Sequence, residues 1–275
     1  MVRSQSLGDY RSKQNGIWQD ILVWEIYDSG SWTAAVYPPN QHSGNIEIIH
    51  QINITADQVL DQVNIVPSGS LSINPGVMVT AINSANVFEI VLKGTLLNQG
   101  MLFFSPSSKM RIDSGGTYIH NSSVSSSVLL DACSIDSLST FIYRGNGTLA
   151  PPVSLSNRTY GHLVFESTAG NWSRTITGSN PISCTSLDVK ANVMLINNLN
   201  NSFTIHGDMT LNGSLVNGSG IQKIILDGQT GKMQGSSLNN FFDTLVIQAG
   251  SNYSQLNNIS SSAGSTVLIS GMLDL

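Results

Sequence analysis

Apolar and polar residues alternate along residues 203–215, which read FTIHGDMTLNGSL. The apolar side chains are Phe203, Ile205, Met209, Leu211 and Leu215. A period of two is that of a β-strand, and Gly207 and Gly213 mark bends between short strands. The segment is therefore predicted to form one coil of strands separated by tight corners.

The end of the chain repeats this pattern in residues 268–275, LISGMLDL. The matching positions are Ile269, Gly271, Leu273 and Leu275 at the end, and Ile205, Gly207, Met209 and Leu211 in the earlier segment. A unit that recurs along a chain is the signature of a solenoid, because each repeat buries its apolar face against its neighbours. The pattern thus predicts stacked coils.

Between residues 45 and 120 many short apolar runs are separated by Gly, Pro, Asn, Ser or Asp. Similar glycine corners recur at Gly69, Gly94 and Gly116, about one solenoid coil apart. Residues 55–63 alone allow a helical turn. These features favour an all-β, right-handed parallel β-helix. An array of β-sandwiches is the alternative, because sandwiches also have short strands and regular turns.

The second half repeats itself at a longer interval. Residues 141–145 and 162–165 match residues 224–228 and 244–247. The glycines that end the first segments are 83 residues apart, and the leucines of the second segments are 82 apart. The match is too long to come from shared composition, so the second half is predicted to contain an internal repeat.

Four regions follow from these patterns. Residues 1–44 are predicted to form an aromatic cap, residues 45–120 a first solenoid section, and residues 141–275 a second section with the internal repeat. The Ser-rich residues 121–140 interrupt the pattern and are interpreted as an irregular insertion that marks the internal boundary.

Three of the four tryptophans, Trp18, Trp24 and Trp32, lie in the first 44 residues. The first coil of a solenoid has no neighbour on one side, so large aromatic side chains are suited to cover it. Alternation predicts that Trp24 and Ile26, and then Trp32, Ala34 and Val36, point inward. The alternative is a face on which sugars stack.

Charge narrows the choice of partners. Only 11% of the residues are charged, the net charge is −5, and Lys and Arg occur singly. Such a chain has no basic stripe for nucleic acid or an anionic membrane, and no apolar run is long enough for a membrane helix. Abundant Asn and Ser are typical of secreted bacterial proteins. We expect export to the cell surface, with any signal peptide absent from this sequence.

The two cysteines, Cys133 and Cys184, allow two interpretations. They could form a disulfide between neighbouring coils, or each could be a small buried hydrophobic residue. Spacing alone does not decide between them, because a disulfide depends on geometry.

A catalytic site in a parallel β-helix would need clustered carboxylates, or acidic metal ligands beside a basic residue. The densest candidates are Asp131 with Asp136, Asp188 with Lys190, and His206 with Asp208. We interpret them as solvated pairs on the exterior, and the other four histidines show no metal-ligand spacing. No catalytic, cofactor or metal residue is predicted. Trp172 is the one candidate for glycan stacking outside the cap.

Several motifs resemble repeat-rich regions of large secreted surface proteins of Bacteroidetes-type bacteria. The matching segments are Tyr10-Arg11-Ser12-Lys13 with Trp18 and then Trp24-Glu25, Tyr160 to Phe165, Gly207 to Leu211, and Gly271 to Leu275. The resemblance covers most of the chain, through short and degenerate motifs, and is weakest over residues 121–140. It implies an exported β-solenoid that serves as a stalk, an adhesin or a matrix component, and it supplies no catalytic motif.

The predicted function is therefore a non-enzymatic structural or adhesive solenoid on the cell surface. Leu273 and Leu275 close an apolar strand without a polar cap, so the last coil is expected to stack on another subunit or to continue into a longer chain. Together with Trp18, Trp24 and Trp32 they are the candidate assembly interface. A glycan-binding module and a polysaccharide-degrading β-helix enzyme remain the alternatives.

Overall fold

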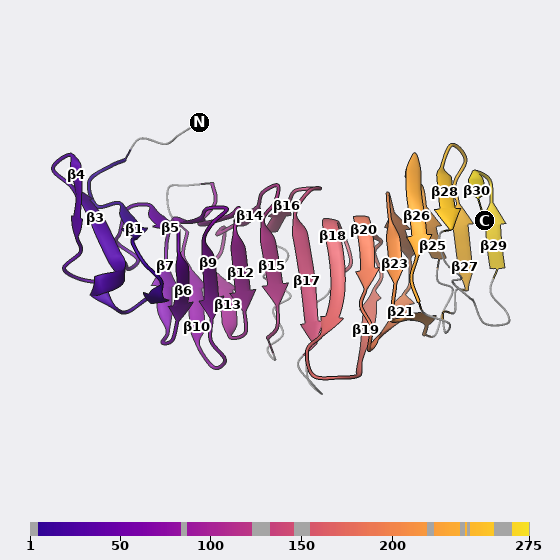
Figure 1. Ribbon diagram of the computed structural model, residues 1–275, viewed down its shortest axis with the longest axis horizontal. Helices are drawn as coiled ribbons and strands as arrows, with labels where there is room; N and C mark the ends of the chain where they lie inside the picture. The colour runs from indigo at the N-terminus through magenta and orange to yellow at the C-terminus, as the bar shows by residue number, and fades with distance from the viewer. Residues whose placement is uncertain are drawn as a thin grey trace. The chain divides into compact units, whose positions relative to one another are not determined.

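A computed structural model describes residues 5–83, 87–122, 133–145, 155–218, 223–236, 240, 243–255 and 266–274. The chain divides into two units, Met1–Ser139 and Thr140–Leu275, referred to below as unit 1 and unit 2. Within each unit, short strands from successive coils lie side by side (Figure 1). This is the stacked arrangement that the repeated apolar pattern predicts.

Unit 1 has three strand-bearing faces. The first face holds, in spatial order, β4 (Ser31–Ala34), β3 (Trp24–Asp28), β1 (Tyr10–Ser12), β5 (Ile46–Ile48), β8 (Val63–Ile65), β11 (Ile90–Leu92), β14 (Met110–Ile112) and β16 (Cys133–Ile135). The second holds β2 (Gly16–Ile17), β6 (Gln51–Ile54), β9 (Ser70–Ile73), β12 (Thr95–Asn98) and β15 (Thr117–His120). The third holds β7 (Gln58–Leu60), β10 (Met78–Ala81) and β13 (Met101–Phe104).

The register of the second face shows the length of a coil. Ile52 pairs with Leu71, Leu71 with Leu96, and Leu96 with Tyr118, which are offsets of 19, 25 and 22 residues. All three pairings are parallel. Parallel strands one coil apart define a β-solenoid and exclude a β-sandwich, whose sheets are antiparallel. The predicted parallel solenoid is confirmed.

The core lies inside the coils and is built by alternation. In β5, β8, β11 and β14 the first and third residues are buried and the middle one is half-buried. Successive side chains of a strand point to opposite faces, so every second residue enters the core. The middle residues consequently form a row on the outer surface.

The amino-terminal segment departs from the parallel pattern and forms the cap. Strands β1, β3 and β4 pair antiparallel with one another, and β1 then pairs parallel with β5 of the first coil. A single 3-10 turn, η1 (Ile21–Val23), precedes β3, and the carboxylate of Asp20 accepts a hydrogen bond from the Leu22 amide. The cap thus joins the solenoid by continuing its first face.

Unit 2 is also a parallel solenoid. Its first face holds β17 (Thr140–Gly145), β18 (Arg158–Ser167), β20 (Ile182–Val189), β22 (Ser202–Ile205), β25 (Lys223–Leu226), β27 (Thr244–Ile247) and β29 (Thr266–Ile269). From β20 a second row branches through β23 (Met209–Leu211), β26 (Thr230–Gln234), β28 (Asn252–Gln255) and β30 (Met272–Asp274). The third face holds β19 (Trp172–Gly178), β21 (Val193–Leu199) and β24 (Ser214–Asn217).

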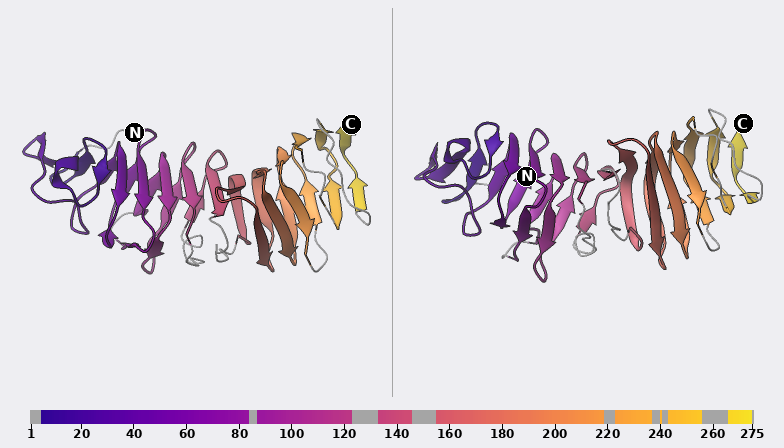
Figure 2. Two further views of the ribbon diagram at one scale, coloured as in Figure 1. Left: turned by 60° about the horizontal axis from the view of Figure 1, so that its bottom comes forward. Right: turned by 90° about the horizontal axis from the view of Figure 1, so that it is seen from below.

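The internal repeat corresponds to equivalent strand pairs. Strand β17 pairs with β18, and β25 pairs with β27, in both cases parallel and one coil apart. The segment at residues 203–215 contributes β22, β23 and β24, and its five apolar side chains are buried. The predicted coil of short strands at residues 203–215 is confirmed, and Figure 2 shows the successive strands of each unit from two further sides.

Two sequence predictions need correction. Residues 55–63 form parts of β7 and β8 rather than a helical turn. Residues 133–135 form β16, which pairs with β14, so this part of the predicted insertion is a regular strand of the solenoid. Residues 123–132 lie outside the described residues, and the boundary between the units falls after Ser139.

Candidate functional site

The last described coil presents core positions to solvent. Val267 and Ile269 of β29 are in register with Leu245 and Ile247 of β27, which are buried. Val267 is 46% exposed and Ile269 is 52% exposed. Leu273 of β30 lies opposite the fully buried Tyr253 and is half-buried. Leu275 lies outside the described residues.

Two tryptophans of the cap, Trp18 and Trp24, lie in its interior and do not contribute to its surface. Trp18 and Trp24 are fully buried, and their rings meet edge to face with centroids 5.0 Å apart. The Trp18 indole donates a hydrogen bond to the Pro39 carbonyl, and the Trp24 indole donates one to the Trp18 carbonyl. Both side chains therefore stabilise the cap, and the prediction that they belong to an assembly interface is wrong.

Apolar side chains other than these tryptophans are exposed on the cap. They are Ile17, Ile21, Leu22, Val36 and Tyr37. Val36 was predicted to point inward, but it is 75% exposed, and Ala35 is buried in its place while Ala34 is exposed. The alternation shifts here because β4 ends at Ala34 and the Ala35 amide bonds to the Trp24 carbonyl.

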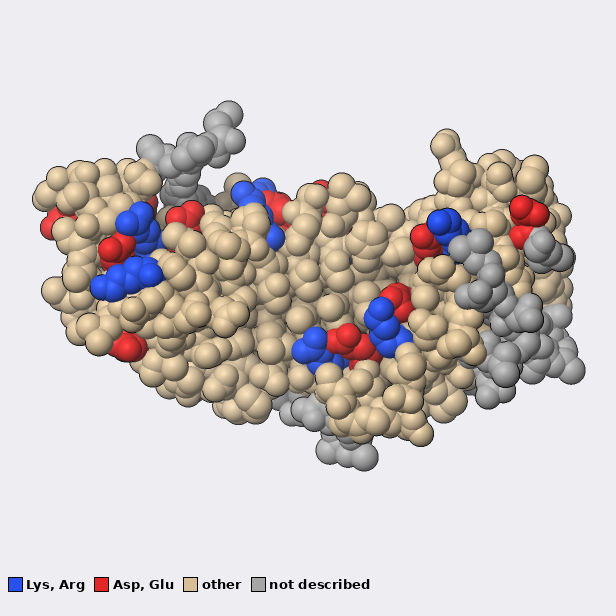
Figure 3. Space-filling view, viewed as in Figure 1, with Lys and Arg blue, Asp and Glu red and all other residues tan. Residues whose placement is uncertain are grey.

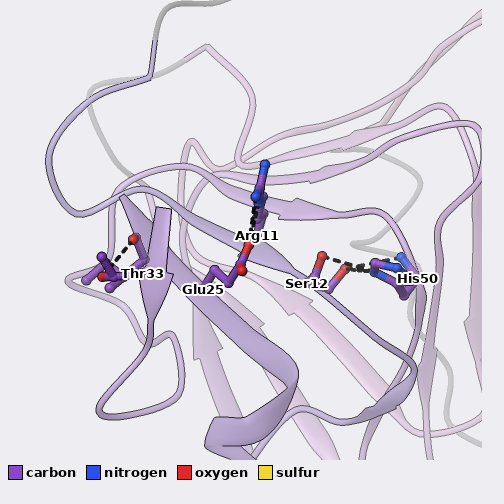
Figure 4. Close-up of polar contacts among 6 residues, drawn as sticks. Arg11, Ser12, Glu25, Thr33 and His50 are labelled. Atoms are coloured by element: carbon purple, nitrogen blue, oxygen red, sulfur yellow. Dashed lines mark hydrogen bonds and ion pairs between the residues drawn. The ribbon is translucent and has the colours of Figure 1, made fainter. Parts of the chain in front are cut away.

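Trp32, the third tryptophan of the cap, is half-buried, and the side chain of Arg11 packs on its ring. The guanidinium carbon of Arg11 lies 4.4 Å from the centroid of its ring. Glu25 on β3 forms an ion pair with Arg11, with a nitrogen to oxygen distance of 2.7 Å (Figure 4). In the same close-up, Ser12 contacts His50 of the first coil.

A groove of about 550 Å³ opens on the outer surface of the first face of unit 1. Its walls include Trp32 from β4 and Phe88 before β11. Polar residues that line it include Asn45, Glu47, Gln62 and Asn64. This groove, called the unit 1 groove below, was not predicted, because its residues are widely separated in sequence and share no motif.

The predicted acidic clusters serve the fold where they are described. The Asp136 carboxylate accepts a hydrogen bond from the Leu138 amide within a turn, and Asp188 forms an ion pair with Lys190. The Asp208 carboxylate accepts a hydrogen bond from the Lys232 amide of the next coil. Asp131 lies outside the described residues.

His206 contacts neighbouring coils rather than Asp208. Its Nε2 lies 2.6 Å from the Ser183 hydroxyl, and its Nδ1 lies 2.5 Å from Asp227 Oδ1. A serine, a histidine and a carboxylate in this order are the groups of a nucleophilic triad. However, Oδ1 of Asp227 accepts no well-directed hydrogen bond, and the His206 side chain is 43% exposed. The three side chains are in close contact on an open surface, and they lack the hydrogen-bonded carboxylate of a triad.

Trp172, the predicted sugar-stacking residue, is almost completely buried. It stacks on Tyr143 with centroids 5.6 Å apart and planes 10° from parallel, and Arg174 also packs on the Tyr143 ring. Trp172 is consequently part of the packing of unit 2, and it offers no face to a glycan.

The disulfide alternative is not realised. Cys184 is a free thiol on β20 and is fully buried, so it takes the role of a small hydrophobic residue. Burial raises the pKa of its thiol well above the usual range. Cys133 on β16 is half-buried.

Cys184 is expected to resist alkylation until the protein unfolds. A thiol with a raised pKa stays protonated near pH 8, and the thiolate is the reactive form. Iodoacetamide labelling followed by mass spectrometry, in buffer and in urea, measures this difference, with Cys133 as the internal reference. Rapid modification of Cys184 in the folded protein would contradict the described packing.

The charged groups that the structure describes lie in small groups of mixed sign. On the face in view in Figure 3, Lys and Arg lie beside Asp or Glu with uncharged surface between the groups. Among the described residues no three His, Cys, Asp or Glu side chains are placed to hold a metal ion. The described part of the chain also contains no helix long and apolar enough to cross a membrane.

No known protein family, no curated protein and no solved structure matches this chain. The function therefore has to be inferred from the two ends of the solenoid and the unit 1 groove.

Proposed function

We propose that this protein is a non-enzymatic structural or adhesive β-solenoid of the extracellular surface, whose subunits stack end to end. The single observation that carries the proposal is the open coil at β29 and β30. Val267 and Ile269 are exposed there, whereas Leu245 and Ile247 at the same positions of β27 are buried.

The free energy of stacking comes from this uncovered core. Burying one aliphatic side chain completely stabilises an association by about 1.5–3 kcal/mol. Among the described residues β29 pairs with β27 and β30 pairs with β28, so the other edge of each strand can pair with residues that continue the chain or with a second copy. The occupant we propose is the cap of a second copy, which exposes its own apolar residues in segment 17–37.

A contact between two different ends does not close on itself and can extend into a filament. Only 11% of the residues are charged, which limits the charge repulsion between two subunits that meet end to end. The described carboxylates of the candidate clusters are held by amides or by a lysine, which supports a role without catalysis. Extracellular location follows from composition and from the resemblance of the motifs.

If the subunits stack, the average molecular mass of the particles should rise with protein concentration. The full-length protein should be studied by sedimentation velocity and electron microscopy over a range of protein concentrations. We expect filaments of uniform width that become longer as the concentration rises. Ile269→Lys should shift the population to single subunits, because it places a charge in the stacking surface.

The matched control is Met194→Lys. Met194 is also an exposed apolar residue, at 42%, but it lies on β21 away from the last coil. This variant should assemble as the parent does. Single rods at every concentration, or equal loss of assembly in both variants, would overturn the proposal.

A further inference from the structure

We infer that the unit 1 groove binds a neutral oligosaccharide. The inference rests on the adhesive role proposed above and names the class of ligand. The groove lies within unit 1, and the residues that line it come from the cap, from β5, β8, β11 and β14, and from positions next to these strands.

The floor of the groove follows from the register of the strands. Glu47 and Asn64 are the middle, outward residues of β5 and β8, and they pair with each other. Arg11 continues this row on one side and Val91 on the other. Outward side chains at one level therefore form a straight row across the strands.

Four polar side chains of the groove are available to a ligand. The side chains of Asn45, Glu47, Gln62 and Asn64 are half-buried, and none makes a hydrogen bond or ion pair with another residue in the described ranges. Carboxamides both donate and accept, and a carboxylate accepts at two oxygens. Together they suit the neighbouring hydroxyl groups of a sugar, each of which also donates and accepts.

Two aromatic side chains supply the apolar part of the site. Trp32 and Phe88 line the groove, and an arginine packs on each ring. Arg11 is held by Glu25 and Arg111 by Asp113, so the ring positions are fixed before a ligand arrives. Fixed aromatic surface with a few polar groups is typical of small-ligand sites.

The dimensions fit a short chain of sugars. From β1 to β11 the face advances by three strand spacings, through β5 and β8. Three spacings amount to about 14 Å, since neighbouring strands lie about 4.8 Å apart. The spacing of one strand is close to the length of one sugar unit in an extended glycan, so equivalent outward side chains can meet successive units.

Peptides and nucleic acids fit the groove less well. The backbone groups of β1, β5, β8 and β11 are already paired with parallel neighbours, so an extended peptide cannot add to the sheet there. The basic residues that line the groove are Lys93 and Arg111, but Glu47 also lines it and Arg111 forms an ion pair with Asp113, so the groove is not a basic track for phosphates. A ligand rich in hydroxyls and without charge is favoured.

Titration of the full chain with cellohexaose, laminarihexaose and mannohexaose tests the inference through tryptophan fluorescence. Trp18, Trp24 and Trp172 are buried, so a ligand in the groove should perturb chiefly Trp32. We expect saturable binding of at least one of the three. Trp32→Ala and Asn64→Ala, the former followed by calorimetry, should each weaken it at least tenfold.

Tyr37→Ala is the matched control, because Tyr37 is an exposed aromatic residue of the cap that does not line the groove. It should bind as the parent does. Absence of binding by all three sugars, or equal weakening by Tyr37→Ala, would overturn the inference. Ile269→Lys should retain sugar binding, so the failure of stacking and the failure of glycan recognition are distinguishable.

Discussion

Replacing Trp24 by alanine is expected to lower the free energy of unfolding of unit 1 by about 3–5 kcal/mol. Trp24 is fully buried, contacts Trp18 edge to face, and donates a 2.8 Å hydrogen bond to the Trp18 carbonyl. The substitution leaves a cavity between the cap and the first coil and an unpaired acceptor. Both effects destabilise the cap, which covers the core of the first coil.

Native-state hydrogen exchange measures this loss for one unit at a time. Amides of β5 and β8 should exchange faster in Trp24→Ala, while those of β22 and β25 in unit 2 should change little. Trp32→Ala is the control, since Trp32 is only half-buried and its contact with Arg11 contributes about 0.5–1 kcal/mol. Equal destabilisation by the two substitutions would contradict the assignment of Trp24 to the core of the cap.

The architecture was predictable because every coil repeats the same path. Phe203 and Ile205, and then Met209 and Leu211, enter the core on two neighbouring faces, so their alternation is readable in one coil. The same alternation in other coils gave the strands of both units. The cap was recognisable from its tryptophans, but its antiparallel pairing carries no repeated pattern and was not predicted.

The polar surface was less predictable, because its contacts run between coils. His206 and Asp208 lie on either side of Gly207, in the bend between β22 and β23, whereas a neighbouring strand lies only about 4.8 Å away. His206 therefore contacts Ser183 and Asp227, which are separated from it by about one coil. Such partners can be found from sequence only once the length of each coil is known.

The unit 1 groove was also not predictable from the sequence, because its residues come from several coils. Trp32, Glu47, Asn64 and Phe88 come from separate coils or the cap, and only the register brings them to one surface. In contrast, the exposed apolar end at β29 follows directly from the repeat, since Ile269 occupies the position of Ile205 three coils earlier. The sequence therefore indicates which residues occupy core positions more readily than which residues meet on the lateral surface.

Replacing Gly94 by alanine is expected to destabilise unit 1 by about 3 kcal/mol, the upper end of the range for overpacking. A Cβ at Gly94 would overlap the carbonyl oxygens of Gly69 and Val66 in the preceding coil. Those carbonyls accept hydrogen bonds from the Thr95 and Gly69 amides, so the backbone cannot move aside without breaking the corner.

Substitutions at Gly115 distinguish backbone strain from the steric overlap expected at Gly94. A Cβ there meets nothing within 4 Å, but its φ of 78° disfavours alanine by about 1–2 kcal/mol. Asparagine tolerates positive φ, so Gly115→Asn should be milder than Gly115→Ala, whereas Gly94→Asn should be no milder than Gly94→Ala. Urea unfolding and hydrogen exchange of β12 measure all four variants. If asparagine relieved the loss at Gly94, strain rather than the close approach of two coils would explain that corner, and the spacing of glycines one coil apart would lose its physical basis.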